Sequence, residues 1–306
     1  MTNHIIIITG QTATGKTKLA LEYAKKFNAE LINCDSRQIY RYLDIITGKD
    51  KHLLNRFKIW LYDVVNPNEY FSSYDFVKLA IPTIKKILLK GKTPIITGGT
   101  YLYLKHLLYG VDTENIPPNW KLRKKLANKS VEELQKTLKS FNLSAFHNLN
   151  QSERSNPQRL IRKIEILSHR AKRQDFQHPR LETSQQQSGK ESQIVIEQKL
   201  AMKNLEVKFI GLKFKNKESL RKAIEKRVGE RLKRGAIEEA EKLLRMGYSE
   251  SDPGLKTIGY QQLILHLKGV LDVDTVIQQW IAKEIQYAKR QYTFMKRDKN
   301  ISWREV

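Results

Sequence analysis

Short apolar runs alternate with helical patterns along much of the chain. Residues 5–8 are four consecutive isoleucines followed by Thr9 and Gly10, and such a compact β-branched run is typical of a strand buried on both faces of a parallel sheet. Runs of this kind predict strands over residues 4–9, 30–34, 93–97 and 207–212. Apolar residues at helical spacing predict helices over 18–27 and 75–89. The alternation indicates a doubly wound α/β core.

From about residue 117 the pattern changes to successive helices rich in Lys and Arg. We expect a helical hairpin or insert over residues 120–141 and helices over 157–172, 217–246 and 276–297. The polar stretch 175–197 indicates a loop. The predicted fold is therefore an α/β parallel-sheet core with a helical insertion domain. Residues 1–116 would begin the core, 117–150 would form the insert, and 151–306 would complete the core and carry the basic helices.

The residues after the first strand match the phosphate-binding pattern G-x-x-x-x-G-K-[ST], with an expected strand before it and a helix after it. Glycines in such a loop let backbone N–H groups converge on phosphate oxygens at a helix N-terminus. Lys16 adds a mobile positive charge, and the Thr17 hydroxyl suits Mg²⁺. The pattern predicts a P-loop NTPase-like core that binds a pyrophosphate-like group, usually that of a nucleoside triphosphate. The expected phosphate contacts are Gly10, Thr12, Ala13, Thr14, Gly15, Lys16 and Thr17.

Two further segments follow expected strands, namely Asp35 after the second strand and Gly98-Gly99-Thr100 after a later one. Ligands of open α/β sheets bind at the carboxyl ends of the strands, so we expect these segments to share one site with Gly10. Asp35 fits either a general base near the phosphates or a helix N-cap. Gly98 and Gly99 fit either a close approach of the backbone to a ligand or a tight turn.

The charge of the chain is strongly basic and uneven. Lys and Arg number 56 against 32 Asp and Glu, which gives a net charge of +24. Residues 1–116 carry +6 and residues 117–306 carry +18, as a polyanion-binding surface requires, although a generally lysine-rich composition gives the same excess. Three helical stripes concentrate basic side chains, and each also fits an ordinary solvated face. They comprise Arg159 with Arg162, then Arg227, Arg231 and Arg234, and lastly Lys283, Tyr287, Arg290, Phe294 and Arg297.

The chain contains a single cysteine, Cys34, so neither an internal disulfide nor a cysteine-based zinc cluster is expected. No apolar run approaches the roughly 18 residues of a membrane span. The first residues also lack the pattern of a secretory signal. We expect a cytoplasmic monomer with no membrane partner.

Six short segments, taken in order, carry a resemblance that covers nearly the whole chain. Each is weak or moderate evidence alone, whereas the ordered set is highly specific. The segments are 10–17, 35–40, 98–103, 156–162, 258–263 and 288–294. With these segments the chain resembles the bacterial tRNA dimethylallyltransferase family.

The resemblance implies an activity that the motifs alone could not give. Family members move the dimethylallyl group of dimethylallyl pyrophosphate to N6 of adenosine 37 of tRNA, with Mg²⁺ assisting, so the loop would hold the leaving pyrophosphate. It implies that Asp35 is the catalytic base and that Thr17 and Arg227 hold the pyrophosphate. It further implies contacts with the tRNA anticodon stem-loop. These are Asp35, Ser36, Arg37, Gln38, Thr100, Arg123, Gln158, Arg159, Leu160, Ile161, Arg162, Lys256, Gly259, Tyr260, Gln261, Lys289 and Arg290.

Two departures from the family pattern lie in or near the expected site. The family usually has proline where this chain has Gln11, and residues 44–49 read Asp-Ile-Ile-Thr-Gly-Lys in place of Asp-Ile-Gly-Thr-Ala-Lys. Three other functions remain open from the sequence: prenylation of free adenosine nucleotides, a P-loop kinase or NTPase, and a tRNA-binding protein with weakened catalysis. The large basic region argues against the first of these, because a free nucleotide does not need it.

Overall fold

The computed structural model describes residues 4–51, 57–110, 113, 116–172, 191–202 and 204–306. The chain divides into two compact units. The core unit comprises Met1–Gly110 with Gln187–Val306, and the insert unit comprises Val111–Gln186.

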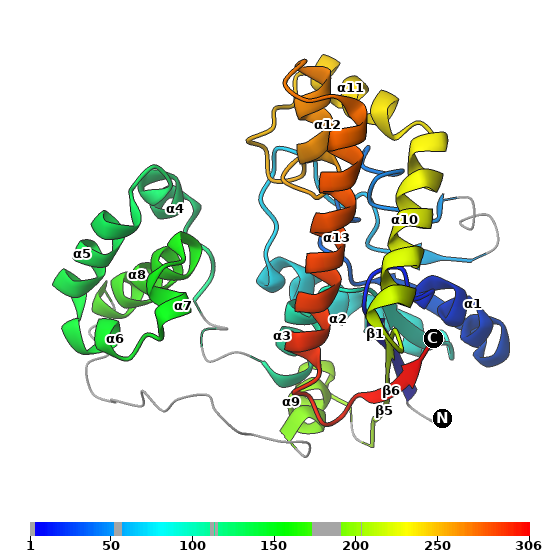
Figure 1. Cartoon of the computed structure of the whole chain (residues 1–306). Coiled ribbons are helices and arrows are strands. Elements are labelled where there is room, and N and C mark those ends of the chain that lie inside the picture. Colours follow the sequence, from blue (N-terminus) through cyan, green and yellow to red (C-terminus); the bar gives the residue numbers. More distant parts are fainter. Residues whose placement is uncertain (1–3, 52–56, 111–112, 114–115, 173–190, 203) are drawn as a thin grey trace. The chain divides into compact units, whose positions relative to one another are not determined.

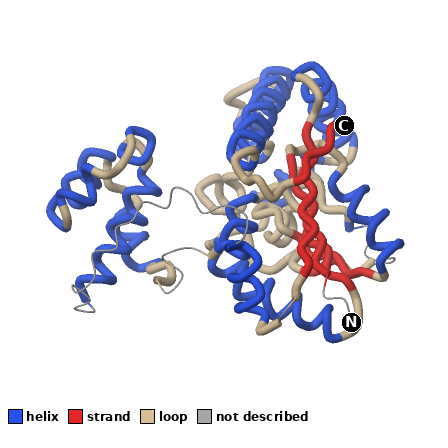
Figure 2. Tube along the Cα trace, turned by 90° about the horizontal axis from the view of Figure 1, so that it is seen from below, coloured by secondary structure: helices blue, strands red, loops and turns tan. Residues whose placement is uncertain are grey.

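The core unit is built on a six-stranded, all-parallel sheet in the order β3-β2-β4-β1-β5-β6 (strands in red in Figure 2). The strands are β1 (His4–Gly10), β2 (Ala29–Asn33), β3 (Ile59–Trp60), β4 (Thr93–Thr97), β5 (Glu206–Lys213) and β6 (Ser302–Glu305). The predicted fold class is confirmed.

Strand β1 shows why the isoleucine run folds as a central strand. Successive side chains of a strand point to opposite faces. Ile5 and Ile7 belong to one apolar cluster and Ile6 and Ile8 to another, and none of the four side chains is more than 3 % exposed. Burial on both faces is what a central parallel strand requires.

Helices cover the sheet and continue the core unit beyond it (Figure 1). They are α1 (Lys16–Phe27), α2 (Ser73–Leu89), α3 (Tyr101–Tyr109), α9 (Glu191–Leu200), α10 (Lys217–Lys233), α11 (Ala236–Arg245), α12 (Tyr260–Leu267) and α13 (Val273–Met295). Helix α2 begins with a capping box between Ser72 and Asp75, which satisfies two backbone N–H groups at its start. No helix in the described parts of the chain is both long and apolar enough to cross a membrane.

Two predictions about helices were wrong. The expected single helix over 217–246 is two helices, because Gly235 adopts a left-handed φ of 92° between α10 and α11, a conformation that glycine adopts without strain. The apolar spacing continues across the break, so periodicity did not reveal it. The end of the expected loop 175–197 lies in α9, whereas residues 175–190 are outside the described residues.

The insert unit is helical and extends further than expected. Its helices are α4 (Trp120–Leu126), α5 (Val131–Phe141), α6 (Leu143–His147), α7 (Gln151–Arg154) and α8 (Pro157–Lys172). Leu160 and Ile164 lie one turn apart on α8 and complete an apolar cluster with Leu134 and Leu138 of α5. Helix α8 therefore belongs to the insert, and the expected boundary at residue 150 differs from the observed division.

Candidate active site at the carboxyl edge of the sheet

The phosphate-binding loop lies between β1 and α1, as its pattern predicts. Gly10 has a φ of 135°, and a Cβ there would lie 2.1 Å from the carbonyl oxygen of Leu212. The Gln11 N–H donates to that same carbonyl oxygen at 3.1 Å. Gly15, with a left-handed φ of 78°, precedes the first residue of α1. Glycine at these two positions lets the loop turn tightly against β5 and start the helix.

Lys16 belongs to the phosphate-binding motif, and its side chain folds back onto the loop. Its Nζ donates to the carbonyl oxygens of Gly10 at 3.2 Å and Gln11 at 2.6 Å. Burial lowers its pKa to about 7, with help from the positive charge of Arg227 and against the opposing effect of Asp35. An anion bound beside Lys16 would raise this pKa, because it favours the charged ammonium.

Asp35 lies just after the carboxyl end of β2, the strand that pairs with β4. Its Oδ1 accepts the N–H of Arg37 at 2.9 Å. Residues 36–39 form a turn and not a helix, so the helix N-cap alternative for Asp35 is replaced by a local side-chain turn. One carboxylate oxygen thereby fixes the position of the side chain.

The Gly98-Gly99-Thr100 segment packs directly on the Asp35 segment. A Cβ at Gly98 would lie 2.1 Å from the carbonyl oxygen of Cys34. Thr100 Oγ1 accepts the N–H of Ser36 at 2.9 Å and donates to the Ser36 hydroxyl at 3.2 Å. Gly98 therefore allows the segments that follow β2 and β4 to pack closely together.

Three tyrosines from separate segments lie within electrostatic reach of Asp35. Burial raises the pKa values of Tyr62, Tyr103 and Tyr287, and the negative charge of Asp35 raises each of them further. Tyr103 follows β4 and Tyr287 lies on α13, both in segments that the sequence had singled out. Tyr62 was missed, because it follows β3, a strand of only two residues.

Arg227 connects α10 to the loop through a short hydrogen bond from its Nη1 to the Thr12 hydroxyl. A Cβ at Gly48 would lie 3.2 Å from Nη2 of Arg227 and 3.1 Å from Nη2 of Arg231, and Gly48 has a φ of 71°. Glycine at position 48, where the family pattern has alanine, thus leaves room for the two guanidinium groups that converge there.

The other arginines of the α10 stripe have different surroundings. Arg231 is buried and donates to Glu284 Oε1 at 2.9 Å. Its pKa falls to about 10 because of burial and the charge of Arg227. Arg234 is exposed.

Several expected tRNA contacts of the core unit have structural roles within it. Gln38 Nε2 donates to the carbonyl oxygens of Thr47 and Gly48. Tyr260 is fully buried, and a Cβ at Gly259 would lie 2.5 Å from Ile46. Arg37 donates to the carbonyl oxygen of Pro253 at 3.1 Å, and Gln261 donates to those of Glu250 at 3.2 Å and Leu255 at 2.9 Å. The exposed members of the set are Lys256, Lys289 and Arg290.

In the insert unit, two of the expected tRNA contacts converge on one buried carboxylate. Glu165 accepts from Nε and Nη2 of Arg123 at 3.0 and 2.7 Å and also from Nη1 of Arg162. Leu160 is completely buried, so its side chain is not available to a ligand, and Ile161 packs against the same cluster. Gln158 and Arg159 are exposed.

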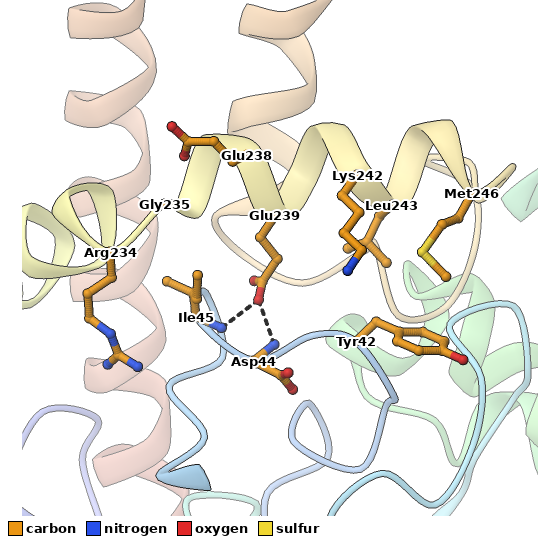
Figure 3. A pocket seen from close by; sticks show the side chains of 10 residues that line it. All are labelled: Tyr42, Asp44, Ile45, Arg234, Gly235, Glu238, Glu239, Lys242, Leu243 and Met246. Atoms are coloured by element: carbon orange, nitrogen blue, oxygen red, sulfur yellow. Dashed lines mark hydrogen bonds between the residues drawn. The ribbon is translucent and has the colours of Figure 1, made fainter. Parts of the chain in front are cut away.

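A cavity of about 340 Å³ lies between α11 and the segment that carries Asp44 and Ile45 (Figure 3). Glu239, which lines it, accepts the backbone N–H groups of Asp44 at 2.9 Å and Ile45 at 2.7 Å. None of the lining residues belongs to the expected pyrophosphate site. Glu239 therefore anchors the loop that carries Gly48 and is not part of the reacting centre.

The fold and these contacts define the class of protein. A phosphate-binding loop follows β1 and a carboxylate follows β2, at the carboxyl ends of the two strands that flank β4 in an all-parallel sheet. This is the arrangement of a P-loop enzyme. The chain belongs to the IPP transferase family, whose model matches residues 38–298. The family expected from the sequence motifs is confirmed.

Curated relatives extend over almost the entire chain. A tRNA dimethylallyltransferase of Endomicrobium trichonymphae is 36 % identical over 98 % of this chain and 94 % of its own length. A protein of the same name from Acetivibrio thermocellus is 34 % identical over 98 % of this chain and 91 % of its own length.

Solved structures show the same similarity. The tRNA isopentenylpyrophosphate transferase of Staphylococcus epidermidis is 30 % identical, with a TM-score of 0.67 over 99 % of this chain and 92 % of that chain. The corresponding enzyme of Bacillus halodurans is 27 % identical, with a TM-score of 0.67 over 99 % of this chain and 90 % of that chain.

Proposed function

We propose that this protein transfers the dimethylallyl group of dimethylallyl pyrophosphate to N6 of adenosine 37 in tRNA and releases pyrophosphate. The observation that carries this proposal is the meeting of the phosphate-binding loop and Asp35 at one edge of the sheet, in a chain of the IPP transferase family. The relatives are named for this activity.

The reaction needs one group to stabilise the leaving pyrophosphate and another to accept a proton. A bond forms between N6 and C1 of the allyl group, while the C1–O bond breaks and its electron pair stays on the pyrophosphate. Loop N–H groups, Lys16 and Arg227 stabilise the negative charge that develops there. The N6 proton passes to Asp35. Because Oδ1 of Asp35 is engaged by the Arg37 N–H, Oδ2 is the expected proton acceptor.

The site could hold Mg²⁺ with few ligands from the protein itself. Thr17 lies in the first turn of α1 beside Lys16, and no group of three His, Cys, Asp or Glu side chains suited to a metal occurs among the described residues. Mg²⁺ is commonly held by one or two protein groups together with substrate phosphate oxygens and water. The Thr17 hydroxyl is the proposed protein ligand, and the ion would supply further charge neutralisation to the pyrophosphate.

The target base must reach Asp35 from an RNA loop. Enzymes that modify a base usually take it out of its stack into a pocket. The exposed Lys256, Lys289 and Arg290 are the proposed contacts to anticodon-loop phosphates, since cations of this kind neutralise the RNA backbone.

Transfer of labelled substrate tests the proposal. The protein is incubated with Mg²⁺, dimethylallyl pyrophosphate labelled in the allyl group, and either unmodified tRNA or the same tRNA with guanosine at position 37. We expect label only in the RNA that has adenosine 37. Parallel incubations contain AMP or ATP in place of tRNA. Label in the free nucleotide, or ATP hydrolysis without any transfer, would show one of the competing functions instead.

A further inference from the structure

Gln291 lies on α13 and connects the two loops that form the site. Its side chain is buried, and its Oε1 accepts the Thr12 N–H at 2.8 Å. Its Nε2 donates to the carbonyl oxygen of Gly99 at 3.0 Å. One amide group therefore joins the phosphate-binding loop after β1 to the glycine loop after β4.

The surroundings of Gln291 are shaped for this bridge. A Cβ at Gly99 would lie 2.3 Å from Nε2 of Gln291, so glycine at this position leaves room for the amide where it lies. A second contact lies one turn earlier on α13, where Gln11 Nε2 donates to the carbonyl oxygen of Ala288 at 3.3 Å. Gln11 Oε1 accepts the N–H of Phe214 at 2.9 Å. The departure at Gln11 thus fastens the loop to α13 as well.

This geometry changes the role of Thr12. Its N–H is directed to Gln291 and its hydroxyl to Arg227, so both polar groups organise the site. The direction of the other backbone N–H groups of the loop, which would bind a phosphate, depends on the loop conformation that Gln291 holds. A buried amide group that loses its partners costs free energy, so the loop and Gln291 stabilise one another.

We propose that Gln291 is a positioning residue that sets the affinity of the loop for pyrophosphate and fixes the loop to α13. This inference rests on the proposed function for the identity of the ligand. Helix α13 also carries the exposed Lys289 and Arg290, so a single helix joins the proposed RNA-binding surface to the leaving-group site.

Gln291→Glu separates positioning from simple loss of packing. Its carboxylate keeps an acceptor for Thr12 but loses the donor to Gly99, and protonation at lower pH restores that donor. We expect the affinity for inorganic pyrophosphate, measured by calorimetry, to fall about tenfold relative to wild type at pH 8. The ratio to wild type should recover toward one as the pH falls, because burial raises the pKa of a carboxyl group and so favours its protonated form.

Gln291→Met and Gln262→Ala complete the test. The first lacks both hydrogen bonds and should bind pyrophosphate weakly at every pH. Gln262 is a matched control, because it is also buried and accepts a backbone N–H, that of Gly259, at 2.8 Å. Gln262→Ala should keep wild-type pyrophosphate affinity.

Two outcomes would overturn the proposal. One is a Gln291→Glu affinity that matches wild type throughout the pH range, and the other is a loss in Gln262→Ala as large as that in Gln291→Met. Prenyl transfer by wild type is measured in parallel. A wild type that binds pyrophosphate but transfers nothing to tRNA would refute the proposed function, and the pyrophosphate titration would still decide the role of Gln291.

Discussion

The core unit and the insert unit differ in which arginine stands apart from a buried ion pair. In the core, Arg227 donates to the phosphate-binding loop, and the charge of its neighbour Arg231 is balanced by Glu284. In the insert, Arg123 and Arg162 both donate to Glu165. Arg159, on the same helix as Arg162, is exposed. A stripe of arginines in a sequence therefore does not show which charges remain available to a ligand.

The largest effect should come from the carboxylate of the core site. Asp35→Asn keeps an oxygen for the Arg37 N–H but cannot accept the N6 proton. We expect prenyl transfer to fall by about 10²–10⁴-fold, the usual contribution of a general base, in a single-turnover assay. Binding of tRNA, measured by filter retention, should stay within a factor of two or so, because the charge change leaves the basic surface intact. A transfer rate close to wild type would contradict the base assignment.

Next in size is the buried carboxylate of the insert. Glu165→Gln leaves two guanidinium groups beside a site with no negative charge, and we expect the insert to lose about 3 kcal/mol of stability. Hydrogen exchange should speed up in α4 and α8 while β1 keeps its protection. The exposed Glu132 on α5 offers a matched control, since Glu132→Gln should change little. Unchanged exchange in α8 would show that the cluster does not stabilise the insert.

A smaller effect concerns the pH dependence of the loop. Lys16 has a pKa of about 7, and bound pyrophosphate raises it, so binding favours the protonated form. Affinity is then highest below pH 7 and weakens as the pH rises above 7, by up to about tenfold per pH unit. Lys16→Arg stays charged over this pH range. Pyrophosphate itself also titrates, but it does so equally in both measurements, so the ratio of wild-type to variant affinity isolates the effect of Lys16. A ratio that does not change between pH 6 and 9 would show that Lys16 is not neutralised in the free protein.

The smallest effect is expected at Arg159. Arg159 is among the tRNA contacts that the family resemblance implies, and its guanidinium is exposed. Arg159→Ala should therefore weaken tRNA binding several-fold. It should also reduce the slope of log affinity against log salt concentration by about one. The melting temperature should not change. Wild-type salt dependence in this variant would remove α8 from the RNA-binding surface.

The sequence predicted the core site better than the insert, for a physical reason. Parallel strands place their carboxyl ends along one edge, so Gly10, Asp35 and Gly98 could be brought together from strand positions alone. Strands β3 and β6 were missed because β3 has two residues and β6 is polar. In the insert, the spacing of Leu160, Ile164 and Leu167 is typical of a buried helix face, but no comparable rule indicates that Arg162 binds Glu165.

Gln291 shows the same limit within the core. Its partner Thr12 is 279 residues away along the chain, and in the sequence Gln291 stood out only as a member of the motif over residues 288–294. Gln11 was visible only as a departure from the family motif. Its contacts with Ala288 and Phe214 became apparent only with the fold.

The most direct test of the account follows both products of a single turnover. The protein is mixed with unmodified tRNA, Mg²⁺ and dimethylallyl pyrophosphate labelled in both the allyl and the phosphate groups, and the reaction is quenched at intervals. We expect pyrophosphate and N6-dimethylallyl adenosine 37 to appear at the same rate and in equal amounts. Release of pyrophosphate without modified adenosine, or modification at another position, would contradict the account.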